Sequence, residues 1–159
     1  QAKENNVPLS SKMEIFKKAS EPYQIESWIL PLIEINEVER ISQNPNYLVI
    51  DVRDTDRYEG KTEPIDLIAG HIPGAINFPF TENLDTNGFF LKPNQLRKKY
   101  NKIFGKIKPE NSVVHCGSGV TACHTLLALD YAEMPIPKLY IGSWSEWSRN
   151  NKIIEKTNP

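Results

Sequence analysis

The fold is decided by the ten-residue stretch VVHCGSGVTA, at positions 113–122. Its β-branched start is typical of a buried strand, and this strand ends directly on Cys116. A Gly-Ser-Gly loop follows, and an apolar helical pattern begins at Val120. The order of strand, glycine-rich loop and helix predicts an α/β fold with the loop at the carboxyl end of a strand.

Outward from this stretch, strand and helix patterns alternate along the chain. Short apolar runs predict strands at residues 47–52, 75–78, 112–115 and 139–141. Apolar residues at helical spacing predict helices at 36–42, 93–104, 120–132 and 144–149. The first helix is expected to begin with Asn36 as its N-cap. This alternation predicts a central, mostly parallel sheet flanked by helices on both faces.

The domain is expected to span residues 35–159. Residues 1–34 are more polar and weakly patterned, so they are expected to form a linker or extension, in which Lys12–Ala19 has the pattern of two helical turns. The whole chain has 159 residues, 39% of them hydrophobic, which suits one globular domain.

Charge and hydropathy exclude two classes of partner. The formal net charge is −1, so no basic surface for nucleic acid is expected. Apolar runs such as Trp28–Ile33 fall far short of the ~20 residues that a membrane-spanning helix needs. The chain is therefore expected to bind neither nucleic acid nor membrane.

The two cysteines, Cys116 and Cys123, are expected to be free thiols. Seven residues apart in a mostly helical segment, they would lie about 10 Å apart, whereas a disulfide needs less than ~7 Å between Cα atoms. Free thiols suit a reducing compartment, and we expect a cytoplasmic protein. No CxxC, HExxH or EF-hand spacing is present, so neither a metal nor another cofactor is expected.

The loop after Cys116 has the composition of an anion site. Gly117 and Gly119 allow successive backbone N–H groups to point inward, and a helix N-terminus adds partial positive charge. Both would stabilise a thiolate, the reactive form of cysteine. Thr121 is a candidate to cap the helix through its hydroxyl. The alternative is that Cys116 is a small buried apolar residue, which is the role expected for Cys123 in the helix core.

A tyrosine phosphatase loop also begins with His-Cys. Such a loop needs an arginine six positions after the cysteine to hold phosphate with two hydrogen bonds. Ala122 occupies that position, so phosphoryl chemistry is disfavoured.

Five sequence blocks occur in an order typical of one family: Val49–Arg53, Arg57–Tyr58, Gly70–Ala75, Cys116–Ala122 and Gly142–Trp147. With these blocks, residues 35–150 resemble the rhodanese-like sulfurtransferases, in particular the C-terminal, catalytic domain of the two-domain enzymes. Thiosulfate enzymes carry Arg-Lys after the cysteine, whereas mercaptopyruvate enzymes carry Gly-Ser. Gly117-Ser118 therefore resembles the mercaptopyruvate type.

The resemblance implies transfer of a sulfane sulfur through a persulfide on Cys116. The donor is a small molecule, 3-mercaptopyruvate by preference, and the acceptor is cyanide or a thiol, such as that of thioredoxin. Cys116 and Ser118 are the catalytic candidates. The substrate-binding candidates are Arg57, Gly117, Gly119, Val120 and Thr121.

Two of these roles have simpler alternatives. Arg57 could form a surface ion pair with Asp54 or Asp56, and Ser118 could be an ordinary loop hydroxyl. Several other residues are expected to serve structure rather than chemistry: Arg53, His71, His115, Trp144 and Trp147.

The chain departs from the mercaptopyruvate type at Ile65, which follows Glu63-Pro64 where those enzymes carry a second arginine. The donor therefore stays open, with thiosulfate as an alternative. The family also implies a preceding, inactive rhodanese-like domain that covers the site, with residues 1–34 as its remnant and linker. The remaining alternative is a module that carries persulfide or binds a partner without efficient turnover.

Overall fold

The computed structural model describes residues 29–157, so the helical turns expected at Lys12–Ala19 lie outside the described residues. The sheet has four parallel strands in the order β2-β1-β3-β4. The strands are β1 (Leu48–Asp51), β2 (Ile76–Asn77), β3 (Ser112–His115) and β4 (Lys138–Leu139). This confirms the predicted parallel sheet, although three strands are shorter than their apolar runs.

The two central strands end at the same edge of the sheet. β1 and β3 pair along their full length, from Leu48 opposite Ser112 to Asp51 opposite His115. Cys116 follows β3 directly, so the glycine-rich loop lies at the carboxyl edge, where open α/β sheets bind ligands.

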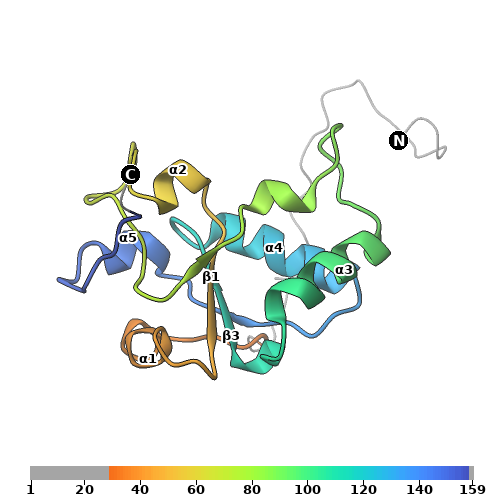
Figure 1. Ribbon diagram of the computed structural model, residues 1–159, viewed down its shortest axis with the longest axis horizontal. Coiled ribbons are helices and arrows are strands. Elements are labelled where there is room, and N and C mark those ends of the chain that lie inside the picture. Colours follow the sequence, from red (N-terminus) through yellow and green to blue (C-terminus); the bar gives the residue numbers. More distant parts are fainter. Residues whose placement is uncertain (1–28, 158–159) are drawn as a thin grey trace, which may run out of the picture.

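Helices cover both faces of the sheet, as predicted. Figure 1 shows α1 and α5 on one side of the central strands, and α3 and α4 on the other. The α-helices are α1 (Ile35–Ile41), α2 (Thr55–Tyr58), α3 (Pro93–Phe104), α4 (Val120–Tyr131) and α5 (Ser143–Trp147). Two short 3-10 helices are η1 (Phe80–Asn83) and η2 (Pro109–Asn111). None of the described helices is both long enough and apolar enough to cross a membrane.

Strand alternation divides the core into two layers. Ile50 and Val114 pack in the layer that contains the buried residues of α3 and α4. Val49 and Val113 pack in the opposite layer, with α1 and with Trp144 of α5. Since both faces are covered, the strands are apolar at successive positions, as the sequence pattern indicated.

Two helix-start predictions are wrong. Glu34, not Asn36, is the N-cap of α1, and no side chain caps that end. Gly119 is the N-cap of α4, so Thr121 lies inside the first turn and does not cap the helix. In both cases the helix begins before the expected capping residue, and that residue already has helical backbone angles.

The prediction that Cys123 belongs to the core is also wrong. The core face of α4 is formed by Ala122, Leu126 and Leu129, whereas Cys123 is exposed. Its side chain lines an open apolar groove together with Leu127. The helix carries apolar residues around much of its circumference, so their spacing alone did not identify the buried face.

Candidate active site

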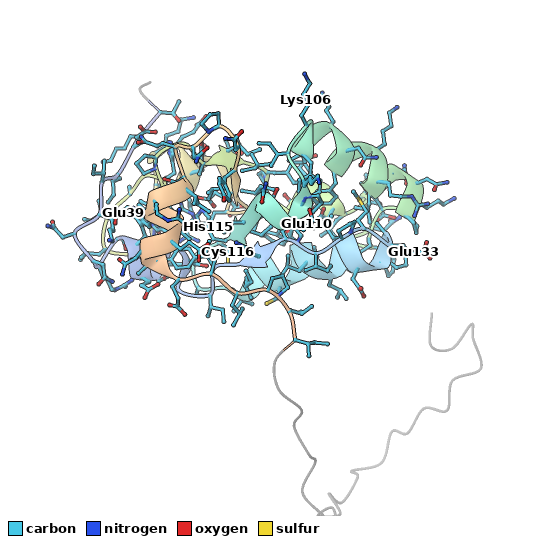
Figure 2. All side chains as sticks on the ribbon, turned by 90° about the horizontal axis from the view of Figure 1, so that it is seen from below. Glu39, Lys106, Glu110, His115, Cys116 and Glu133 are labelled. Atoms are coloured by element: carbon cyan, nitrogen blue, oxygen red, sulfur yellow. The ribbon has the colours of Figure 1, made fainter. Side chains whose placement is uncertain are left out.

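Cys116 lies where the chain leaves β3, beside His115 (Figure 2). Its side chain is 2% exposed and lines a cavity of about 190 Å³. The other residues lining this cavity are Arg57, Ile65, Asp66, Gly117, Ser118, Val120, Thr121 and Ser145. The structure therefore gathers at one cavity all of the predicted site residues except Gly119.

The loop after Cys116 carries backbone N–H groups that have no acceptor among the described residues. Gly119 has φ +83° and turns the chain into α4, whose first-turn hydrogen bond runs from Cys123 N to the Gly119 carbonyl. Among residues 29–157, no group accepts a hydrogen bond from the N–H of residues 117–121. These free donors, at the N-terminus of a twelve-residue helix, can stabilise an anion on the cysteine sulfur.

Helix α5 holds the carbonyl groups of the same loop. Trp144 N donates to the Cys116 carbonyl at 3.0 Å, and Ser145 N donates to the Gly117 carbonyl at 2.8 Å. The buried Ser143 Oγ accepts from Cys116 N at 3.2 Å and donates to the Tyr140 carbonyl. The loop backbone is thus fixed by a helix more than twenty residues away in sequence.

Arg57, in the last turn of α2, forms one wall of the cavity. Its Nη2 lies 2.7 Å from Glu63 Oε1 and 3.2 Å from Asp66 Oδ2, and its Nε also donates to Glu63. Both terminal nitrogens lie 3.6 Å from the point where a Cβ on Gly117 would be. The alternative partners Asp54 and Asp56 are wrong, because the guanidinium points toward the following loop rather than along its own helix.

Sequence reasoning missed Asp66 and Ser145. Ser145 Oγ donates to Asp66 Oδ1 at 2.5 Å, and Arg149 Nη1 donates to the same oxygen at 2.9 Å. Asp66 lies in an irregular loop and pairs with residues about eighty positions away, so no local spacing marked it. The block Gly142–Trp147, quoted above, was the one signal that pointed to Ser145.

The remaining predicted residues have different surroundings. Ser118 and Val120 are exposed at the cavity, and Thr121 is half-buried there. Gly119 is buried and supplies the turn instead of a wall, because its backbone packs against Ile141.

Arg53 is confirmed as a structural residue. Its side chain is buried, donates to Asp51 at 2.6 Å and to the Gly70 carbonyl at 2.7 Å, and lies 4.6 Å above the Trp144 ring. Its Nη1 also lies 3.3 Å from Glu63 Oε2, so one carboxylate contacts both Arg53 and Arg57. The guanidinium thereby ties the edge of the sheet to the loop that carries Glu63.

His71, Trp144 and Trp147 have structural surroundings as well. His71 stacks on Tyr58 with 3.9 Å between ring centroids, and its Nδ1 lies 2.7 Å from the Tyr58 carbonyl. Trp144 and Trp147 are almost completely buried in the core layer of α1 and α5.

His115 faces away from Cys116. It lies near Tyr140, in the layer opposite the one that contains Cys116, and its Nε2 is 3.8 Å from Asp51 Oδ2. Burial lowers its pKa from 6.5, although Asp51 acts in the opposite direction. The imidazole is therefore neutral at pH 7 and is directed away from the sulfur.

Within the part of the chain that the structure describes, no three His, Cys, Asp or Glu side chains come close enough to hold a metal ion.

Comparison with known proteins identifies close relatives. A family model described as the rhodanese-like domain matches residues 34–150. The probable 3-mercaptopyruvate sulfurtransferase of Pseudomonas aeruginosa is 48% identical over 103 residues, which cover 65% of this chain and 36% of that protein. The 3-mercaptopyruvate sulfurtransferase of Rattus norvegicus is 38% identical over 150 residues, covering 89% of this chain and 48% of that protein.

A solved structure supports the same relationship. The 3-mercaptopyruvate sulfurtransferase from Leishmania major superposes with a TM-score of 0.61 at 27% identity, over 83% of this chain and 39% of that one. The chain spans less than half the length of each of these three proteins. The family match runs from the start of α1 past the end of α5, and it includes every residue of the cavity. The chain therefore belongs to the rhodanese-like domain family.

Proposed function

We propose that this domain is a sulfurtransferase that moves a sulfane sulfur from a donor to a thiol or cyanide through a persulfide on Cys116. The observation that carries the proposal is the run of N–H groups at residues 117–121, which have no acceptor among the described residues, in the loop that borders the cavity of Cys116. These donors would stabilise both the attacking thiolate and the terminal sulfur of a persulfide anion.

The proposed first half-reaction starts from the Cys116 thiolate and 3-mercaptopyruvate. The thiolate attacks the donor sulfur, a sulfur–sulfur bond forms, and the carbon–sulfur bond breaks with its electron pair moving to carbon. The resulting enolate of pyruvate takes up the proton that the donor thiol carried. The products are pyruvate and a persulfide anion on Cys116, so atoms and charge balance.

The second half-reaction returns the enzyme to its starting state. An acceptor thiolate or cyanide attacks the outer sulfur, and the Cys116 thiolate leaves. A small dithiol protein such as thioredoxin is a suitable acceptor, and the free state of both cysteines suits a reducing compartment such as the cytoplasm. No cofactor is needed for either step.

Arg57 favours a carboxylate donor. A guanidinium donates charged hydrogen bonds to a carboxylate, and Nη1 of Arg57, which donates to no described residue, lies against Gly117, next to the nucleophile. Thiosulfate is the alternative donor, but Gly117 and Ser118 add no cation to hold its two charges. Ser118, which lies on the cavity wall, is the candidate to bind the donor or relay a proton.

An apolar rim around the cavity supports a role for a preceding domain. Ile65, Leu67 and Val120 are each about 70% exposed, and Ile65 and Val120 line the cavity itself. Because the chain spans less than half of its relatives, we propose that residues 35–159 are the catalytic domain and that residues 1–34 link it to an inactive rhodanese-like domain that covers this rim. Without that cover, the domain would carry persulfide with little turnover.

Intact-mass spectrometry tests the proposal. Incubation with 3-mercaptopyruvate should add one sulfur, about 32 Da, to the wild-type chain and to the Cys123→Ser variant, but not to Cys116→Ser. The exposed Cys123 serves as the matched control for a thiol outside the cavity. Absence of the adduct, or its persistence in Cys116→Ser, contradicts the proposal.

Initial rates distinguish the donors and the alternative function. Faster loading by 3-mercaptopyruvate than by thiosulfate supports the carboxylate donor, and the reverse order supports thiosulfate. Persulfide that forms but is not passed to cyanide or reduced thioredoxin, in this chain or in one that includes a preceding domain, would favour the persulfide-carrying module.

A further inference from the structure

We propose that Asp66 is a positioning residue that orients Arg57 toward the donor's anionic group, and that Arg149 is the counter-ion that keeps Asp66 from repelling that donor. This inference rests on the proposed function and adds two residues to it. Asp66 acts through the guanidinium of Arg57, and Arg149 acts through Asp66.

Asp66 is a buried carboxylate at the cavity wall. Its side chain is 1% exposed, and its Oδ2 lies 3.2 Å from Arg57 Nη2. Its backbone N–H donates to Glu63 Oε1 at 3.0 Å, so the loop itself is folded around the carboxylate that also binds Arg57. Two acids therefore hold the guanidinium from the side of this loop.

This arrangement leaves one nitrogen of Arg57 available. Nε and Nη2 donate to Glu63 and Asp66, whereas no described residue accepts a hydrogen bond from Nη1. That nitrogen lies 3.6 Å from the Cβ position of Gly117, the residue directly after the nucleophile. Asp66 thus helps to fix a guanidinium whose free donor faces the loop of Cys116.

The same geometry creates an electrostatic problem. Asp66 Oδ2 lies only 3.8 Å from the Cβ position of Gly117, so its negative charge stands beside the place of an anionic donor and a thiolate. Like charges at this separation repel strongly in a partly buried site. Arg57 alone would have to neutralise Asp66 and also bind the donor. A second cation next to Asp66 would remove this conflict.

Arg149 supplies the second cation. Its Nη1 lies 2.9 Å from Asp66 Oδ1, the oxygen that also accepts from Ser145 Oγ, and donates to the Ser145 carbonyl at 2.6 Å. Arg149 is half-exposed, and the pair would be unremarkable on an open surface, where it contributes little. Here its partner is buried, so loss of Arg149 leaves Asp66 with Arg57 as its one described cation, and Arg57 also has to bind the donor.

The experiment measures formation of the Cys116 persulfide at increasing 3-mercaptopyruvate, in the Cys123→Ser background. Asp66→Asn should raise the half-saturating donor concentration by about five-fold or more, because a charged hydrogen bond that orients Arg57 is lost. Arg149→Gln should raise it by about three-fold at low salt, and less at high salt. Arg40→Gln, which removes an exposed ion pair with Glu37, is the matched control and should have no effect.

Two further measurements separate positioning from a structural role. Alkylation of Cys116 by iodoacetamide, which is uncharged, should stay within about two-fold of the wild-type rate in both variants. In the double variant, Arg149→Gln should add no further loss to Asp66→Asn, since the charge that Arg149 compensates is already gone. Equal losses with 3-mercaptopyruvate and with iodoacetamide, an unchanged half-saturating concentration in Asp66→Asn, or additive losses in the double variant would overturn the inference.

Protection of Cys116 from iodoacetamide by pyruvate distinguishes failure of this inference from failure of the proposed function. Pyruvate carries the carboxylate but no sulfur, so protection that weakens in Asp66→Asn supports the positioning role even if no persulfide forms. If wild type shows neither persulfide nor protection, both proposals are wrong.

Discussion

The Cβ position of Gly119 lies 2.9 Å from the carbonyl oxygen of Ile141, and the φ angle of Gly119 is +83°. Any side chain at residue 119 would therefore meet backbone in a conformation that non-glycine residues rarely adopt. The backbone at the start of α4 thus lies close to the segment after β4, and only a glycine fits the turn that leads from the cysteine loop into α4.

Gly119→Ala should destabilise the domain by about 2 kcal/mol or more, from the left-handed backbone and the contact with Ile141. Gly117→Ala is the matched control, because Gly117 has no positive φ and its Cβ would lie at an ordinary 3.6 Å from Arg57. Urea unfolding followed by circular dichroism measures both. Similar losses in the two variants would contradict the role assigned to Gly119.

Arg53→Met should cost about 3–5 kcal/mol of unfolding free energy, because the Asp51 and Glu63 carboxylates would remain buried without their shared cation. Arg40→Met removes a 70% exposed guanidinium and should cost less than about 0.5 kcal/mol. Chemical denaturation of both variants gives the comparison. A small loss for Arg53→Met would mean that its contacts contribute little to folding.

Tyr100→Phe should cost about 1–2 kcal/mol, because the buried Asn83 Oδ1 loses the hydroxyl that donates to it at 2.7 Å. Burial also raises the pKa of Tyr100 to about 12, so this hydroxyl stays protonated over the whole stability range of most proteins. Tyr131→Phe changes a 51% exposed residue and serves as the control. Equal unfolding midpoints for the two variants would contradict this assignment.

Stability should fall as the pH drops through about 6.5, the ordinary histidine value. Burial lowers the pKa of His115 in the folded state, so the unfolded chain takes up the proton first and is favoured at lower pH. Burial lowers the pKa of His124 as well, which adds to the slope. His115→Gln should flatten, but not abolish, the pH dependence of the urea midpoint between pH 5 and 7. An unchanged slope in that variant would show that His115 titrates normally in the fold.

Local sequence patterns correctly predicted those helices and strands whose apolar residues recur at a regular spacing. The helix at 93–104 and the strand at 112–115 have the predicted bounds, because each begins or ends at a proline, a turn or the cysteine loop. Cys116 was identified from the order of strand, glycine-rich loop and helix around it, and Arg57 from a short block that carries a family pattern. Their meeting at one cavity follows from the parallel sheet, which brings the ends of β1 and β3 together.

The rest of the site depends on contacts between distant segments. Asp66 meets Ser145 and Arg149 only because the loop before β2 packs on α5, where Trp144 Nε1 donates to the Ile68 carbonyl. No spacing within that loop encodes the contact. The exposure of Cys123 was missed for a related reason, since the sequence of α4 does not say which of its apolar faces meets the sheet.

The sharing of Glu63 between Arg53 and Arg57 has a consequence for how this domain can change. Glu63 Oε2 contacts Arg53, which ties down the sheet edge, and both oxygens of Glu63 contact Arg57 at the cavity. A substitution at Glu63 that changes the position of one arginine must therefore also change the contacts of the other. Substitutions at Ile65 or Ser118 are less constrained. Both residues line the cavity, but their side chains form none of the ion pairs that stabilise the fold, so they can change with a new donor preference.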